Sequence, residues 1–425
     1  MRNPWFPVAL GWLIVGVGVR FAQAQAPPKS LATWAENPFD VRLAFDREAE
    51  PTLPERLVGR AIRFEEPGTE NDRQGALNVA AARLEDDGRT LVLTTDPHPR
   101  AGRYTLDVPG LKATYDLSGV EVSWREGEDD PAEWTGWWPS LDPVRSRRIV
   151  GNAPAFEKVW KALETPGRLT LTTLLTLPEG PQTIRVRSSR SVTPTIDGLE
   201  PDSGETETRP GEAAEFEVEP TGFPVLLVAI VPTGEGLPSF TLNVTTEPSD
   251  GSAKERPVED SATLPPWVPP SPAPPPPLGS VPELSGGDPV RGATVFKSPE
   301  SKCATCHKFR GQGGEVGPDL TDLVGRDRNE VYRAVVEPSA QIHPNYVSYT
   351  LALNDGRVFA GIVRAEGADS LRVIDAEGKA TTLPRSEVQE FRPSATSIMP
   401  VGLAGAIGEQ GLRDLIAYLT TPVAR

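Results

Sequence analysis

A proline-rich stretch about two thirds along the chain most constrains how it can fold. Residues 265–279 read PPWVPPSPAPPPPLG. Proline has no backbone N–H and a fixed φ, so such a run forms neither a helix nor the interior of a sheet and favours extended polyproline II. We therefore predict a linker over residues 247–285. It separates the front of the chain from a C-terminal unit at 286–425, which we expect to fold alone.

Charge is distributed unevenly on the two sides of this linker. The 425-residue chain has a net charge of −16, but residues 286–425 hold 16 Lys and Arg against 17 Asp and Glu. The acidity therefore belongs to the front of the chain. A strongly negative surface repels a phosphate backbone, so we expect no nucleic acid as a partner.

The first 26 residues have the pattern of an export signal. Arg2 supplies a positive charge, and the apolar run at 5–19 is followed by small residues at Ala24 and Ala26. The run of about 15 residues is shorter than the roughly 20 that a membrane-spanning helix needs. We predict cleavage after Ala24 or Ala26, a periplasmic or otherwise exported protein, and no transmembrane segment after cleavage. An uncleaved signal that serves as an anchor is the alternative.

Residues 30–118 show strand and turn patterns. The segments 39–45, 91–95 and 104–108 alternate or are rich in β-branched and aromatic residues, and Asp, Gly and Pro bound them. Short strands at this spacing predict an all-β, sandwich-like domain. The stretch loosely resembles bacterial Ig-like domains, which implies an Ig-like β-sandwich. His98 lies in a Pro-His-Pro turn, where we expect it to be solvated.

Residues 119–246 predict a second β-rich domain. Its most notable feature is the aromatic group Trp134, Trp137 and Trp138. Stacked rings of this kind bind sugar faces, but large aromatics also fill the core of a β-sandwich, and we favour the core. The strand candidates are 169–175, 183–187, 214–218, 225–230 and 240–244, and a short helix is expected at 155–163.

Residues 302–308 read KCATCHK and contain both cysteines of the chain. Cys-x-x-Cys-His is the attachment signature of a c-type haem, in which Cys303 and Cys306 form thioethers and His307 binds the iron. A redox disulfide would need a thioredoxin-like strand–helix pattern, and a zinc site would need a second Cys/His pair; neither is present. We therefore predict one covalently attached haem c.

Three candidates exist for the sixth iron position. Met399 is the only methionine besides Met1 and lies in Ser-Ile-Met-Pro. Its soft sulfur favours ferrous haem and raises the reduction potential. His343, in Ile-His-Pro, is the less favoured ligand, and the third option is an open position with Met399 as a core residue. We predict His307 and Met399 as the axial pair.

The C-terminal unit resembles class I cytochromes c. GDPVRGATVF ahead of CATCH and DLIAYL near the end carry this resemblance. It implies that the first and last helices of the unit cross at Gly292, beside Phe296 or Tyr418. It also implies that the carbonyl of Pro318, in Gly-Pro-Asp-Leu, accepts the proton on the far nitrogen of His307.

Residues 346–391 lie between the predicted axial ligands and have a strand pattern with a hairpin turn at 354–356. We expect a small β-meander or barrel inserted into a mainly α cytochrome c domain. The expected fold class is thus multidomain, with two all-β N-terminal domains in front of that unit. The combination resembles the C-terminal haem-binding domain of large exported proteins in planctomycete- and verrucomicrobia-type bacteria. The matching residues are Cys303, Cys306, His307, 317–320, 337–340, 355–357, Gly361 and 397–400.

Together these features predict an iron- and metal-binding protein, an exported monohaem c-type cytochrome that transfers single electrons to or from a redox protein. With both axial positions filled the iron has no vacancy for a substrate, so we expect an electron carrier and not an enzyme. One alternative is a haem-based peroxidase or sensor with a labile Met399. Another is a cell-surface or polysaccharide-binding protein that carries an electron-transfer domain. An acidic partner is expected to dock on a weakly basic rim of Lys302, Lys308, Arg310, Arg326 and Arg328.

Overall fold

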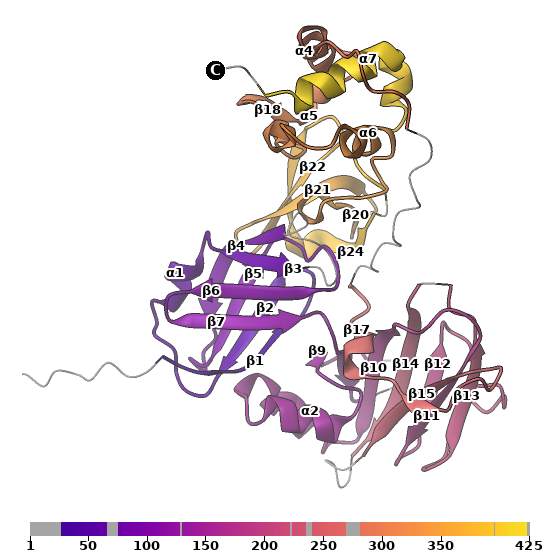
Figure 1. Cartoon of the computed structure of the whole chain (residues 1–425). Coiled ribbons are helices and arrows are strands. Elements are labelled where there is room, and N and C mark those ends of the chain that lie inside the picture. Colours follow the sequence, from indigo (N-terminus) through magenta and orange to yellow (C-terminus); the bar gives the residue numbers. More distant parts are fainter. Residues whose placement is uncertain are drawn as a thin grey trace, which may run out of the picture.

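The computed structural model describes residues 27–65, 75–127, 130–221, 223–234, 240–268, 281–394 and 396–422. The expected export signal at 1–26 and most of the proline run, at 269–280, lie outside the described residues. Figure 1 shows two β domains, a group of helices at the other end of the molecule, and a further sheet between the helices and the first β domain. Within the described ranges, no helix has the length and apolar character needed to cross a bilayer.

The first domain is built on one antiparallel sheet of seven strands in the order β1-β2-β5-β4-β3-β6-β7. Strand β4 pairs with β3 at one end and with β5 at the other, and a register shift between Val79 and Ala81 separates the two halves. Such an irregularity bends a strand, which lets the sheet fold over its own core. The domain therefore fits the expected Ig-like sandwich only loosely. Its elements are β1 (Ser30–Ala35), β2 (Asp40–Phe45), α1 (Leu53–Leu57), β3 (Ala61–Glu65), β4 (Gly75–Leu84), β5 (Thr90–Thr95), β6 (Arg103–Val108) and β7 (Leu111–Asp116).

His98 lies inside this domain, and the expectation that it is solvated is wrong. The side chain is 1% exposed. Its Nδ1 lies 2.8 Å from the carbonyl oxygen of Pro38 and its Nε2 lies 2.9 Å from the Tyr115 hydroxyl. Because a carbonyl only accepts, Nδ1 carries the proton and Nε2 accepts from Tyr115. His98 is thus a buried imidazole with both ring nitrogens hydrogen-bonded.

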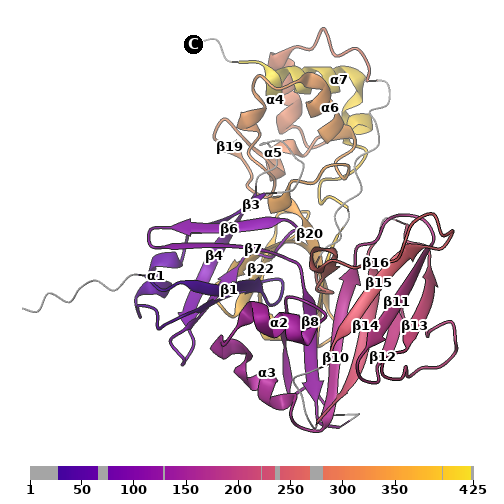
Figure 2. The same cartoon turned by 60° about the horizontal axis from the view of Figure 1, so that its bottom comes forward.

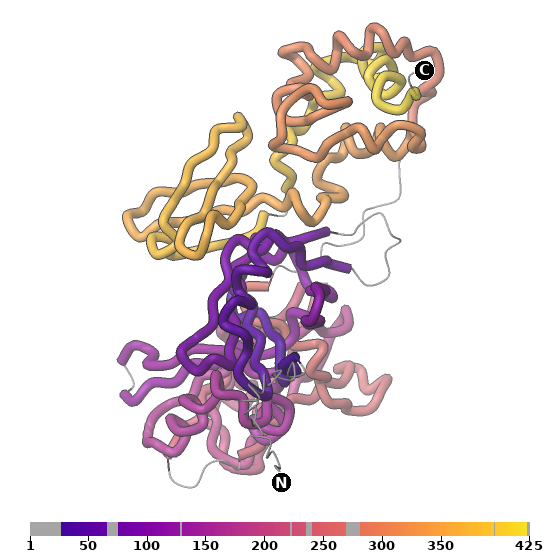
Figure 3. Tube along the Cα trace, turned by 90° about the vertical axis from the view of Figure 1, so that its left-hand side faces the viewer, coloured from indigo at the N-terminus to yellow at the C-terminus, as the bar shows by residue number. Residues whose placement is uncertain are grey.

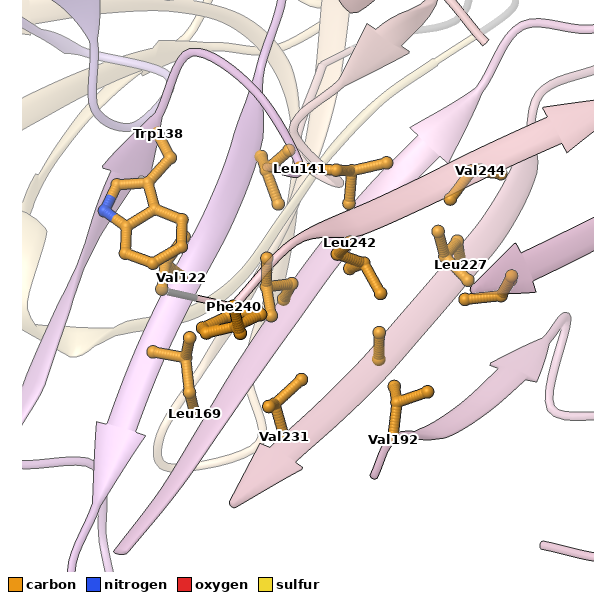
Figure 4. Packing of buried hydrophobic residues seen from close by; sticks show 14 of the residues in the cluster. Val122, Trp138, Leu141, Leu169, Val192, Leu227, Val231, Phe240, Leu242 and Val244 are labelled. Carbon is orange, nitrogen blue, oxygen red and sulfur yellow. The ribbon is translucent and has the colours of Figure 1, made fainter. Parts of the chain in front are cut away.

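The second domain is a sandwich of two sheets, with strand orders β12-β14-β10-β8-β9 and β13-β11-β15-β16; β17 also pairs with β10. Side chains from both sheets form one core, part of which Figure 4 shows around Trp138 and Phe240. Strands β16 and β17 come from the stretch expected to be linker. The elements are β8 (Val120–Arg125), β9 (Trp134–Trp138), α2 (Pro143–Val150), η2 (Pro154–Phe156), α3 (Glu157–Ala162), β10 (Gly167–Leu175), β11 (Gln182–Ser188), β12 (Thr193–Ile196), β13 (Ala213–Val218), β14 (Val225–Thr233), β15 (Leu242–Pro248), β16 (Arg256–Pro257), η3 (Asp260–Ala262) and β17 (Thr263–Leu264).

The interpretation of the tryptophan group as core is confirmed. Trp138 is fully buried. Trp137 stacks on Trp34 of the first domain, with ring centroids 5.8 Å apart, and donates its indole N–H to the carbonyl of Ser118 at 2.8 Å. These rings therefore pack the second domain and join it to the first.

The helices of the C-terminal unit pack around a core of their own. The two that lie far apart in sequence, α4 and α7, pack side by side, as Figure 2 also shows. Gly292 lies at this contact, where a Cβ would be only 2.6 Å from Tyr418 Cβ. Arg291 and the nearly buried Asp414 form an ion pair at 2.7 Å across it. The elements are α4 (Pro289–Lys297), α5 (Cys303–Cys306), β18 (Lys308–Phe309), β19 (Gln312–Gly313), η4 (Leu320–Leu323), α6 (Arg328–Val336), η5 (Pro344–Tyr346) and α7 (Leu403–Thr420).

A five-stranded antiparallel sheet, in the order β23-β22-β21-β20-β24, follows η5. It has a separate core, which includes Leu351, Val363 and Leu371 and also Phe39 of the first domain. The expectation of a mainly α C-terminal domain with a β insertion is therefore wrong. The described chain is 38% strand and 20% helix, with five sheets, and the strands of the C-terminal unit form a sheet whose core is separate from that of the helices. The elements are β20 (Ser348–Leu353), β21 (Val358–Glu366), β22 (Ser370–Ile374), β23 (Ala380–Pro384), η6 (Arg385–Glu387) and β24 (Val388–Pro393).

This five-stranded sheet is docked on the first β domain, as Figures 1 and 3 show from two directions. Arg385 forms an ion pair with Asp40 at 2.7 Å and donates to Asn37 Oδ1 at 2.9 Å. The rings of Phe39 and Phe391 meet with centroids 4.8 Å apart. The C-terminal unit is thus joined to the front of the chain by a packed interface as well as by the linker.

Candidate cofactor-binding site

The predicted site residues come from segments almost a hundred positions apart and line one cavity. Its volume is about 600 Å³, and Cys303, Cys306, His307, Pro318 and Met399 all contribute to its wall. This size lies in the range of small-molecule and cofactor sites. The rest of the wall is mostly apolar and comes from η4, α6, α7, strand β21 and the loops between them: Val316, Leu320, Leu323, Val331, Val335, Ile342, Ile362, Ile398, Leu403, Ile407, Leu415 and Leu419.

His307 follows directly after the one-turn helix α5, and its ring is fixed by the loop that comes next. Its Nδ1 lies 2.9 Å from the carbonyl oxygen of Pro318, so Nδ1 carries the proton and donates it. The other nitrogen, Nε2, keeps its lone pair. Burial lowers the pKa of His307, while the bond to Pro318 opposes this shift. The ring is therefore a neutral imidazole with one nitrogen able to bind a metal.

A glycine makes this arrangement possible. A Cβ at Gly317 would lie 2.5 Å from Cε1 and 2.7 Å from Nδ1 of the His307 ring. Real side-chain carbons do not approach so closely, so any other residue would displace the ring or the loop. The Gly-Pro pair therefore serves two purposes: the glycine lets the loop approach and the proline carbonyl sets the tautomer.

The two cysteines do not have the character of redox thiols. Neither is in a disulfide. Burial raises the pKa of both the Cys303 and Cys306 thiols. Catalytic Cys-x-x-Cys pairs instead have lowered pKa values that favour the thiolate. The geometry thus supplies two neutral thiols at the edge of an apolar cavity, beside an imidazole.

The two candidates for the sixth ligand differ in whether the side chain has a lone pair available to bind iron. Both Met399 and His343 line the cavity. Nδ1 of His343 accepts the backbone N–H of Asn345 at 3.2 Å, so its Nε2 carries the proton and has no lone pair to offer. Met399 has no such restriction, and its backbone N–H donates to Ser397 Oγ at 3.1 Å. Ser397 in turn donates its backbone N–H to Ser339 Oγ at 3.0 Å, which holds this loop.

The expectation of a metal-binding protein is wrong when the side chains are considered without a cofactor. In the part of the chain that the structure describes, no group of three or more His, Cys, Asp or Glu side chains is placed to hold an ion. One imidazole and one thioether beside an apolar cavity do not make a closed ion site.

The expected basic rim is partly neutralised. Lys308 forms an ion pair with Glu315 at 3.0 Å, and Arg310 donates to the carbonyl of Thr421 at 2.7 Å. Lys302 lines the cavity, but so does Glu377. The rim therefore has mixed charge, and a purely electrostatic dock for an acidic partner loses support.

The comparisons with known proteins show only weak similarity. No protein-family model matches the chain, and no curated protein matches it. A PA14 sugar-binding domain from an RTX adhesin aligns at 14% identity over 35% of this chain and 98% of its own, with a TM-score of 0.24. An anti-sigma factor domain-containing protein from Clostridium clariflavum aligns at 10% identity over 56% and 92%, with a TM-score of 0.23. The epithelial adhesin 6 A domain from Candida glabrata, in complex with Galb1-3GlcNAc, aligns at 8% identity over 38% and 91%, with a TM-score of 0.22. TM-scores this low do not show a shared fold.

Proposed function

We propose that the C-terminal unit holds one covalently attached haem and serves in single-electron transfer. The observation that carries the proposal is the convergence of Cys303, Cys306, His307 and Met399 on one apolar cavity of about 600 Å³. The residues fit a haem: two neutral thiols for its vinyl groups, a fixed imidazole, a soft sulfur and an apolar wall. When bound, the haem supplies reversible one-electron chemistry at its iron.

Each residue has a separate task in this proposal. The thiols of Cys303 and Cys306 anchor the group, and His307 presents its Nε2 because Pro318 holds the proton on Nδ1. Met399 offers a soft thioether, which favours the reduced state. The apolar side chains from α6 and α7 exclude water and keep the local dielectric low.

The test begins with the full chain produced in a host that exports and matures c-type haem proteins. A pyridine haemochrome assay and the intact mass are expected to give one haem per chain. The double variant Cys303→Ser with Cys306→Ser is expected to give none. In the ferric protein, the weak far-red band of a sulfur–iron bond is expected and is lost in Met399→Ala. If the band is absent from the unaltered protein, the sixth site is open and the peroxidase or sensor alternative gains support. A chain without haem would overturn the proposal.

As a second candidate, we propose that the second β domain contacts a cell-surface polysaccharide. The observation that favours it is the exposure of two large apolar side chains of this domain, Phe223 at 69% and Leu199 at 62%. Phe223 comes two residues before β14 and Leu199 three residues after β12, and these two strands pair with Ile196 opposite Leu227. An exposed aromatic ring is a surface on which a sugar face can stack.

Cosedimentation with insoluble polysaccharides tests this second candidate. The full chain is expected to bind, and Phe223→Ser is expected to abolish binding. Val358→Ser is the matched control, because Val358 is equally exposed at 64% but lies on the five-stranded sheet. Equal loss in both variants would point to nonspecific apolar adsorption and count against the candidate.

A further inference from the structure

One wall of the cavity is fastened by the first β domain. Ile342, His343 and Tyr346 line the cavity and belong to the segment that leads into and forms η5. Arg100 lies in the first domain, between β5 and β6, and its Nη2 donates to the carbonyl oxygen of Ile342 at 2.8 Å. The Arg100 residue is only 6% exposed. A buried guanidinium with a backbone acceptor is a strong and directional anchor.

A second contact from the same domain holds the next residues. The backbone N–H of Ala76, in β4, donates to Asn345 Oδ1 at 3.1 Å. A Cβ at Gly75 would lie 2.9 Å from Asn345 Oδ1 and 3.1 Å from Pro344 Cβ, so the glycine permits this approach. From the other side, Arg364 of β21 donates to the Asn345 carbonyl at 2.5 Å. The segment 342–346 is thus held between two sheets, one of which belongs to the first domain.

Arg100 also brings a positive charge close to the cavity. Burial lowers the pKa of His343, and the charge of Arg100 lowers it further. His343 is itself part of the wall, so the field of Arg100 reaches the cavity. Charges act over longer distances in a poorly solvated interior than at a surface. A positive charge there stabilises the more electron-rich state of any redox group in the cavity.

We propose that Arg100 is a positioning residue of the cofactor site, which fastens the wall at 342–346 and adds a buried positive charge beside the cavity. The inference rests on the proposed haem function. It makes the first β domain a structural part of the redox unit, which the sequence pattern of either part alone does not indicate.

The experiment uses the full-length, haem-loaded chain and three variants. Arg100→Met removes the charge and the fork of donors, whereas Arg100→Lys keeps the charge and loses the fork. Arg89→Met is the matched control, because Arg89 also donates to a backbone carbonyl, that of Phe45 at 3.1 Å, but within the first domain. The readouts are the binding of imidazole to the ferric protein in place of the methionine sulfur, the reduction potential, and the thermal midpoint.

Arg100→Met is expected to bind imidazole on the order of fivefold more tightly, because the wall is looser, and to have a lower potential. Arg100→Lys is expected to keep the potential but to bind imidazole more tightly. Arg89→Met is expected to match the unaltered protein in both, even if its thermal midpoint falls. The proposal is overturned if Arg100→Met and Arg100→Lys change the thermal midpoint alone. The failure of the haem proposal is distinguishable, since the haemochrome assay of the unaltered chain would then be negative.

Discussion

At the scale of single residues, two histidines are controlled by backbone carbonyls of proline. The Nδ1–H of His307 donates a hydrogen bond to the carbonyl oxygen of Pro318, and that of His98 donates to the carbonyl oxygen of Pro38. Neither ring has a carboxylate partner among these bonds, so burial keeps both neutral and lowers the pKa of each. The ring of His307 lines the cavity and keeps a lone pair on Nε2, whereas both ring nitrogens of His98 are hydrogen-bonded.

His98 makes stability depend on pH. Burial lowers its pKa from 6.5 to about 4. The unfolded chain therefore takes up a proton at a higher pH than the folded chain does, and stability falls as the pH drops from 6.5 towards 4. At pH 4.5 the loss from this residue is expected to be about 2 to 3 kcal/mol.

The measurement is the free energy of unfolding in urea at pH 7 and at pH 4.5, for the unaltered protein and for His98→Gln. Carboxylates also titrate in this range, so the informative quantity is the difference between the two proteins. His98→Gln is expected to be less stable at pH 7 but to lose less on acidification. An identical pH dependence in both proteins would show that His98 is not the group responsible.

At the scale of elements, the contact between α4 and α7 requires a residue without a side chain at position 292, which is a glycine. A Cβ at Gly292 would lie 2.6 Å from Tyr418 Cβ and would also meet the backbone carbonyl of Asp414. Gly292→Ala is therefore expected to push the helices apart and to destabilise the protein by about 1 to 3 kcal/mol.

Gly405→Ala in α7 is the control for this prediction, because no heavy atom lies within 4 Å of the Cβ it would add. Alanine is the better helix former, so Gly405→Ala is expected to be neutral or slightly stabilising. Thermal unfolding followed by circular dichroism distinguishes the two. Similar midpoints for both variants would mean that the helices can move apart without cost.

Local patterns predicted local structure well. The strand segments at 39–45, 91–95 and 104–108 are confirmed as β2, β5 and β6, because alternation is a property of neighbouring residues. The joining of β4 to both β3 and β5 was not predictable, since pairing partners leave no local signal. For the same reason the prediction of a linker over 247–285 is wrong at β17, which pairs with β10.

The site shows the same division. The motif at Cys303, Cys306 and His307 and the choice of Met399 came from residue types and spacing, and the structure places all four around one cavity. The contact of Arg100 with the cavity wall was not predictable, because it joins residues more than 240 positions apart in the sequence. Sequence periodicity does not distinguish the apolar wall of a cavity from a core, since both have the same pattern.

At the scale of the whole molecule, the docking of the five-stranded sheet relies on Arg385. Burial raises the pKa of Asp40, but the hydrogen bonds and charge of Arg385 outweigh it and keep that pKa below its ordinary value. Arg385→Met would leave a largely buried carboxylate without its cationic partner, with hydrogen bonds from Asn37 and Thr94 alone, at a cost of about 1 to 3 kcal/mol. The first domain and the sheet are then expected to unfold in separate steps.

Differential scanning calorimetry checks this prediction. The unaltered protein is expected to show one shared transition for the two parts, and Arg385→Met two. Arg372→Met is the matched control, because Arg372 lies on this sheet and its ion pair, with Glu366 at 3.7 Å, is internal to the sheet. A single unchanged transition in Arg385→Met would show that apolar contacts alone hold the interface.

The docked interface also limits how this chain can be divided or shuffled. A cut in the proline-rich stretch would not release two finished modules, because Phe391 and Arg385 would be exposed on one piece and Phe39 and Asp40 on the other. A gene that carried the last 140 or so residues behind a different partner would have to replace this face with polar side chains, or bring the first β domain with it. Recombination would therefore have to transfer the first β domain together with the C-terminal unit that contains the Cys-x-x-Cys-His motif.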